Sequence, residues 1–74
     1  PVAVLGNPVY EVLALALPGP MRVEVVDAAG RSIYSALLSE GTQRIPAQSW
    51  DAGVYHVITT SGTAVSSQKV VVLR

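Results

Sequence analysis

The single histidine is the first side chain that could do chemistry in this chain of 74 residues. A catalytic histidine needs a nucleophile and an orienting acid beside it, and a metal-binding one needs further ligands. The chain has no cysteine and no second histidine, and His56 follows Tyr55 inside a stretch of strand-forming residues. We therefore interpret His56 as an ordinary residue on the face of a sheet.

The acidic residues do not form a catalytic pattern either. A glycosidase pair or a calcium site needs carboxylates clustered on neighbouring elements. No serine stands in a Gly-x-Ser-x-Gly elbow, and Pro18-Gly19-Pro20 lacks the free N–H groups of a phosphate-binding loop. We expect no enzymatic activity, no metal and no cofactor. The carboxylates are dispersed along the chain: Glu11, Glu24, Asp27, Glu40 and Asp51.

Trp50 is open to two interpretations. Turn-forming residues surround it, so a tight loop from Ala47 to Ala52 would place the indole ring in the core, the commoner role of a lone tryptophan. An exposed ring would instead offer a stacking platform for a sugar, as in carbohydrate-binding modules.

The composition describes one folded domain, residues 1–74. Hydrophobic residues make up 50% of the chain, and five basic and five acidic side chains give zero net charge, so no binding to nucleic acid is expected. The basic residues, Arg74 included, are dispersed and are expected to be solvated. The apolar run from Val12 to Leu17 is far shorter than the roughly 20 residues of a membrane-spanning helix. Since the chain starts at Pro1 rather than Met, we expect it to be detached from an N-terminal passenger.

Turn signals recur about every eight to twelve residues, the spacing of a small all-β fold. Hairpin connections are expected at Asp27-Ala28-Ala29-Gly30 and at Ser61-Gly62. The sequence predicts a small Ig-like antiparallel β-sandwich of about seven strands. The segments that we identify as strands are Val9 to Leu17, Met21 to Asp27, Arg31 to Leu38, Thr42 to Ile45, Val54 to Thr60 and Thr63 to Leu73.

Alternation predicts which side chains are buried. Val23 and Val25 face away from Arg22 and Glu24, and the side chain of Tyr55 is assigned to the core.

The last strand consists of Lys69 and an apolar segment from Val70 to Leu73, and it has two interpretations. In the first, which chain physics alone favours, Val71 and Leu73 fill the core and Lys69 blunts a sheet edge. In the second, a receptor reads the strand through β-augmentation or another edge contact.

Four short motifs follow one another along the chain: Asn7-Pro8, Asp27-Ala28-Ala29-Gly30-Arg31, Ala52-Gly53-Val54-Tyr55 and Lys69-Val70-Val71-Val72. Together they resemble the C-terminal sorting domain of the type IX (Por) secretion system of Bacteroidota, and the resemblance covers essentially the whole chain. The chain departs from that family in two places, because Leu5-Gly6 replaces an aromatic-Pro pair and Asp51 replaces the common proline before Ala-Gly.

The resemblance implies a transport address without catalysis. Such a domain directs a covalently linked passenger from the periplasm through the outer-membrane translocon. A sortase then usually removes the domain, and the passenger is secreted or attached to the cell surface. The residues implied in translocon recognition are Lys69, Val70, Val71, Val72, Leu73 and Arg74. The residues implied in defining the fold are Asn7, Pro8, Asp27, Gly30, Gly53 and Tyr55.

Two other functions stay open: an Ig-like adhesive or carbohydrate-binding module that uses Trp50 or a strand face, and a purely structural stalk domain. Apolar edge strands also allow a homodimer through edge pairing or a domain swap. Gly53 leads directly into a strand, so we expect its backbone to hold a conformation that is closed to β-branched residues.

Overall fold

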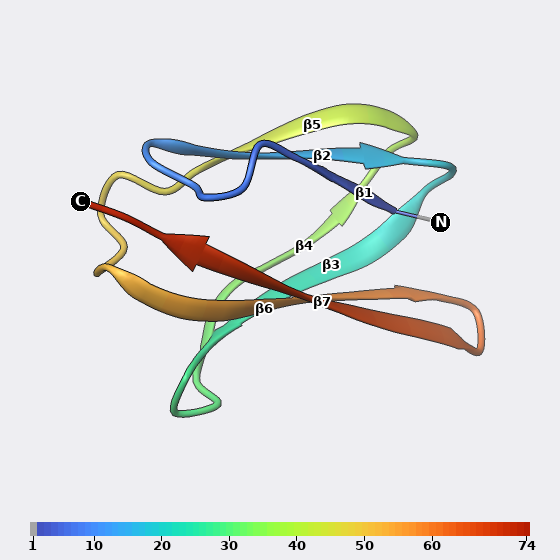
Figure 1. Ribbon diagram of the computed structural model, residues 1–74. Helices are drawn as coiled ribbons and strands as arrows, with labels where there is room; N and C mark the ends of the chain where they lie inside the picture. Colours follow the sequence, from blue (N-terminus) through green and yellow to red (C-terminus); the bar gives the residue numbers. More distant parts are fainter. Residues whose placement is uncertain (1) are drawn as a thin grey trace.

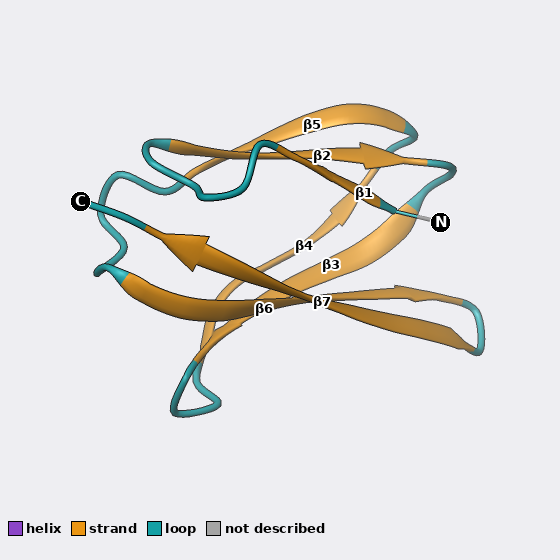
Figure 2. Cartoon of the chain, in the orientation of Figure 1, coloured by secondary structure: helices purple, strands orange, loops and turns teal. Residues whose placement is uncertain are grey.

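The computed structural model describes residues 2–74, which contain seven strands and no helix (Figures 1 and 2). The prediction of an all-β fold is confirmed. No helix of the described residues is long and apolar enough to cross a membrane. The strands are β1 (Ala3–Leu5), β2 (Val12–Leu17), β3 (Met21–Asp27), β4 (Ser32–Leu38), β5 (Gly41–Pro46), β6 (Gly53–Ser61) and β7 (Ala64–Val72).

Two antiparallel sheets form a β-sandwich. One sheet has three strands in the order β1-β2-β5, and the other has four in the order β4-β3-β6-β7. In Figure 1 the three-stranded sheet lies above the strands of the larger sheet, and β7 runs along the front toward the C-terminus. The chain changes sheet between β2 and β3, between β4 and β5, and between β5 and β6. Because β7 is last in the order β4-β3-β6-β7, it is an outer strand of the larger sheet.

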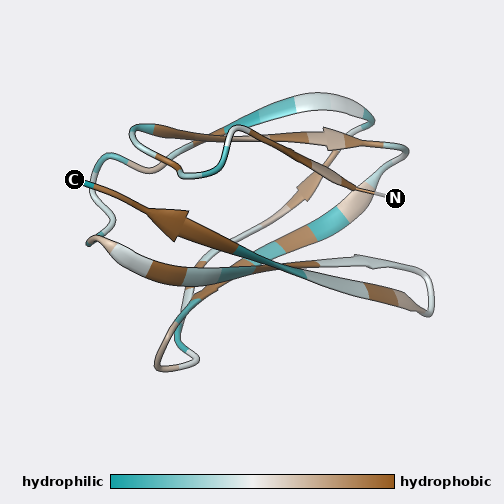
Figure 3. Cartoon of the chain, in the orientation of Figure 1, coloured by the Kyte–Doolittle hydropathy of each residue, from teal (hydrophilic) through white to brown (hydrophobic). Residues whose placement is uncertain are grey.

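The core lies between the sheets and takes one side chain in two from each central strand. Leu13 and Leu15 of β2 and Val23 and Val25 of β3 have 0% exposed surface. Positions two apart share a face of a strand, which is why the alternation of charged and apolar residues predicted the buried face of β3 correctly. Tyr55 of β6 is buried as well, as expected. Figure 3 shows the hydrophobic colouring of β2 and of the last part of β7.

The β3–β4 turn explains the Asp27-to-Gly30 motif. Asp27 Oδ1 accepts hydrogen bonds from the backbone N–H of Ala29 at 3.0 Å and of Arg31 at 2.9 Å, and Oδ2 accepts one from Arg31 Nε at 2.9 Å. Gly30 has a φ of 85°, which only glycine adopts without cost. The hydrogen bond from the Arg31 backbone, followed by that from its side chain, holds the pKa of Asp27 below its usual value, against the opposing effect of desolvation.

The entry into β2 differs from the predicted strand. We expected one strand from Val9 to Leu17, but β2 begins at Val12, and Val9 forms an isolated parallel bridge with Val72. Both backbone groups of Val9 bond to the last segment of the chain, at Val71 and Leu73, so Val9 does not continue the ladder of β2. Before it, Gly6 has a φ of 84° and Pro8 has no N–H. The segment before them forms β1, a strand that was not predicted and that pairs with β2.

The β6–β7 hairpin turns one residue later than predicted. Ser61 pairs with Ala64, so Gly62 and Thr63 form the turn, and Gly62 supplies a φ of 62°. β7 accordingly begins at Ala64 and ends at Val72, inside the predicted range.

Candidate functional site

The end of β7 turns its even-numbered residues toward the core. Val70 and Val72 have 0% exposed surface, whereas Leu73 is 41% exposed and Val71 is half-buried. The interpretation that Val71 and Leu73 fill the core is therefore wrong. Val70 lies opposite Tyr55 in the ladder, and paired residues of neighbouring strands point to the same face. The burial of Tyr55 thus determines the burial of Val70.

Residues from the start of the chain close the outer edge of β7 at its end. Val9 N–H donates to Val71 O at 2.7 Å, and Leu73 N–H donates to Val9 O at 2.9 Å. Asn7 Oδ1 accepts a further hydrogen bond from Val71 N–H at 3.2 Å. These contacts satisfy backbone groups that an edge strand otherwise leaves open to another chain.

The earlier half of the same edge is open. Val71 and Leu73 direct their backbone groups away from β6, so the alternation of an antiparallel ladder directs those of Val65, Ser67 and Lys69 the same way. Within residues 2–74 no backbone hydrogen bond reaches these three. Lys69 is the one charged residue of β7, and it stands where the open half meets the closed half.

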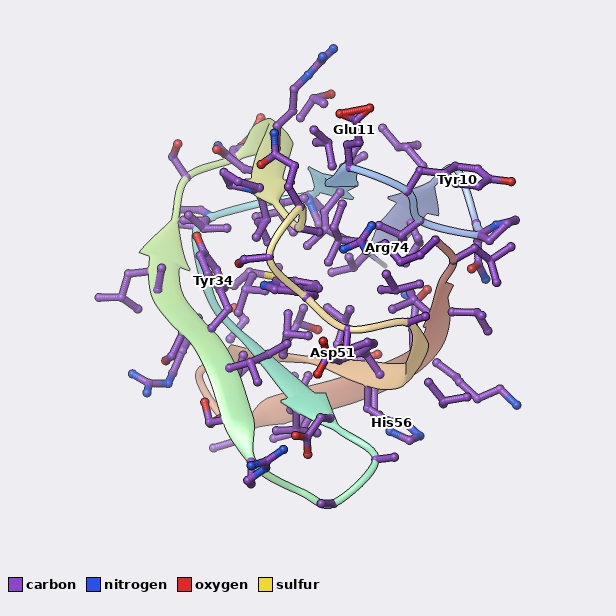
Figure 4. All side chains as sticks on the ribbon, turned by 90° about the vertical axis from the view of Figure 1, so that its left-hand side faces the viewer. Tyr10, Glu11, Tyr34, Asp51, His56 and Arg74 are labelled. Carbon is purple, nitrogen blue, oxygen red and sulfur yellow. The ribbon has the colours of Figure 1, made fainter. Side chains whose placement is uncertain are left out.

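Arg74 is bound to the protein and is not the freely solvated charge that we expected. Its guanidinium donates to Trp50 O, from Nε at 3.0 Å and from Nη2 at 2.5 Å, and also to the carbonyl oxygens of Tyr10 and Ala47. Figure 4 shows the Arg74 side chain between the segment of Tyr10 and the loop that precedes β6, while the Tyr10 ring points outward. No sequence pattern marks this role, because the acceptors are backbone carbonyls.

The loop between β5 and β6 is held a second time by Tyr55. The Tyr55 hydroxyl donates to Asp51 O at 2.5 Å, and its ring centroid lies 5.5 Å from that of Trp50. Burial, with a further contribution from the charge of Asp51, raises the pKa of Tyr55 above its ordinary value. Trp50 packs against the core but stays half-buried, so the expected insertion of its ring is only partial. The Tyr55 ring lies tilted by 35° against the Trp50 ring.

Gly53, which opens β6, has a φ of 153°. A side chain at this position would meet no heavy atom within 4 Å, so the constraint comes from the backbone and not from crowding. The expectation of a conformation closed to β-branched residues agrees with this angle.

The side chains that could do chemistry are not gathered into a site. His56 lies on the outer face of the larger sheet, opposite Val26 on one side and Lys69 on the other. Glu11, Asp51 and His56 lie in separate places in Figure 4. Across residues 2–74 no three metal-binding side chains come together. A hollow of about 260 Å³ at the β3–β4 turn contains Asp27 and Arg31, but these two are already paired with each other.

Comparison with known proteins identifies a matching family and a solved structure with a similar fold. The model of the family described as "Secretion system C-terminal sorting domain" matches residues 3–73. No curated protein is similar enough to the chain to be matched.

Among solved structures, the chain is similar to part of PorZ from Porphyromonas gingivalis, described as an essential bacterial surface component of the type-IX secretion system. The TM-score is 0.86 at 21% sequence identity, and the match covers 99% of this chain. The chain spans only 11% of PorZ. At this identity the likeness shows a shared fold.

Proposed function

The chain belongs to the family of type IX secretion system C-terminal sorting domains, and from this premise we propose that it carries a linked passenger from the periplasm through the outer-membrane translocon. A sorting domain is a targeting domain without catalysis, and proteins that carry one are secreted or attached to the cell surface. We propose that a sortase then processes the precursor and that the passenger stays on the surface.

The terminal strand is the part that we propose the translocon reads. The supporting observation is the division of its side chains: Lys69 and Leu73 are exposed and Val71 is half-buried, all on the outer side of the sheet. Val70 and Val72 serve the core. Recognition of the folded domain would therefore use the odd-numbered residues, and Val70 and Val72 would contribute by holding the strand in place.

The division also determines how the proposal should be tested. Deleting Val70 to Arg74 removes two core valines, so loss of export would not separate recognition from misfolding. A sharper variant is Lys69→Ala with Leu73→Ala, which changes only exposed side chains. A matched control is Leu37→Ala, since Leu37 is 80% exposed on β4 of the same sheet.

The experiment fuses residues 1–74 behind a periplasmic reporter in a host with a type IX system. We expect the reporter at the cell surface, its retention in the periplasm with the Lys69 and Leu73 variant, and normal export with Leu37→Ala. Thermal unfolding of each purified domain verifies that the variants fold. Export of the double variant at the normal level would refute recognition through these side chains.

A further inference from the structure

Arg74 joins three separate parts of one end of the sandwich. Its guanidinium donates to the carbonyl of Tyr10, which lies between β1 and β2, and to those of Ala47 and Trp50, which lie between β5 and β6. Arg74 itself follows β7. Because one side chain bonds to both connections, it holds the end of β7 in a fixed position relative to each of them.

The chemistry of these contacts is particular to arginine. A guanidinium presents five N–H donors in a rigid planar fork, whereas a lysine ammonium is a compact charge with three donors. In the described residues, 2–74, the one ion pair is between Arg31 and Asp27, so no carboxylate holds Arg74. All of its recorded partners are backbone carbonyls, and its role therefore depends on hydrogen-bond geometry and not on an acidic partner.

The strand that Arg74 follows is also held at Val71 and Leu73 by Asn7 and Val9. Tyr10, one of the residues that bind Arg74, is the immediate neighbour of Val9. Both sets of hydrogen bonds thus hold the segment from Val71 to Arg74. One set binds its backbone, and the other binds the side chain of Arg74.

We propose that Arg74 is a positioning residue: it fastens the end of β7 to the sandwich so that Val71 and Leu73 keep a fixed orientation, and it is not itself read by the translocon. The proposal rests on the proposed sorting function for its consequence in the cell. Its structural part can be tested on the isolated chain, without any secretion system.

The structural test is amide hydrogen exchange on the 74-residue chain and on Arg74→Ala. We expect exchange at Leu73 and Trp50 to become about tenfold faster or more, because charge-assisted hydrogen bonds hold the segments that carry these amides. Exchange at the central amides of β3 and β6 should stay slow, which separates a local release from general loss of stability. Arg74→Lys should give an intermediate rate, because an ammonium can satisfy fewer of the carbonyls.

The matched control is Arg44→Ala, which removes an exposed arginine from β5. It should leave exchange at Leu73 and Trp50 unchanged. If Arg74→Ala also leaves both amides unchanged, the positioning role is wrong, whatever happens to export.

The reporter assay tests the consequence. Faster local exchange together with reduced surface display supports the proposal, and Arg74→Lys should then fall between the native chain and Arg74→Ala in both measurements. Faster exchange with undiminished display overturns the link to recognition. Failure of the native fusion to export would count against the sorting function alone, since the exchange result does not depend on it.

Discussion

Leu73 and Val9 are joined through their backbones although they come from opposite ends of the chain. Leu73 N–H donates to Val9 O at 2.9 Å, and Val9 N–H donates to the neighbouring Val71 O at 2.7 Å. The residues that follow the first strand therefore hold the end of the last one. Asn7 adds its side-chain oxygen to the same contact.

Asn7→Ala should loosen the end of β7. The Val71 N–H loses the acceptor at Asn7 Oδ1, and a hydrogen bond of this kind is worth about 0.5–1.5 kcal/mol. Amide exchange at Val71 should become faster, with a matching loss in the free energy of unfolding measured in urea. Asn7→Asp keeps an acceptor at this position and is the control. Equal exchange rates in Asn7→Ala and the native chain would show that this hydrogen bond does not stabilise the end of β7.

Val72→Ala and Val71→Ala change the same side chain at adjacent positions with opposite burial. Val72 has 0% exposed surface, so its truncation should lower the free energy of unfolding by roughly 2–3 kcal/mol. Val71 is half-buried, and its truncation should cost less than about 1 kcal/mol. Denaturant unfolding of both variants provides the comparison. Equal losses would contradict the assigned face of β7.

The face of the last strand shows where the sequence was informative and where it was not. In β3 the charged residues Arg22 and Glu24 alternate with buried valines, so the buried face of the strand could be predicted. From Val70 to Leu73 every residue is apolar, and a continuous apolar run does not indicate which of its side chains face the core. The signal that could have found it is the two-residue turn, which pairs odd residues of β6 with even residues of β7.

The contacts of Arg74 and Val9 could not be predicted for a different reason. Both act on backbone groups of distant segments, and any residue type supplies such groups. The β3–β4 turn is the opposite case, because Asp27 and Gly30 are each chosen for a local hydrogen bond or a local φ.

Gly53→Val should destabilise the domain by about 1–3 kcal/mol, because a β-branched residue at a φ of 153° is strained. Gly53→Ala should show much of the same loss, since the space around the position is open and the cost comes from the backbone. Gly19→Ala is the control, because Gly19 is not among the positive-φ glycines and has no heavy atom within 4 Å of an added Cβ. Thermal melting of the three variants measures the difference. A Gly53→Val domain as stable as the native one would rule out the strain.

Acid should release the β3–β4 turn. The folded state holds the pKa of Asp27 below its ordinary value, so the ionised carboxylate stabilises the fold at pH values above that ordinary value. The contribution is lost as the pH falls through the folded-state pKa. Asp27→Asn should therefore be less stable than the native chain at neutral pH and closer to it at about pH 2. Unfolding midpoints at both pH values provide the measurement, and a constant gap between the two proteins would contradict the prediction.

Leu37→Lys should reduce self-association. β4 is the other outer strand of the larger sheet, contains no charged residue, and exposes 80% of Leu37. Uncharged edge strands pair with other chains, and a lysine opposes that pairing. We expect sedimentation velocity to show a concentration-dependent dimer for the native chain and less of it for the variant. A native chain that stays monomeric at millimolar concentration would exclude edge pairing through β4.

The place of Val70 and Val72 in the core has a consequence for when the domain can fold. A ribosome makes β7 after every other strand, and the six earlier strands cannot close the core without these two valines. Because pairings between distant segments form slowly, newly made chains should remain incompletely packed until synthesis has passed Val72. The strand proposed as the export address is thus also the strand that completes the fold, which leaves an interval in which a chaperone could bind the unfinished domain.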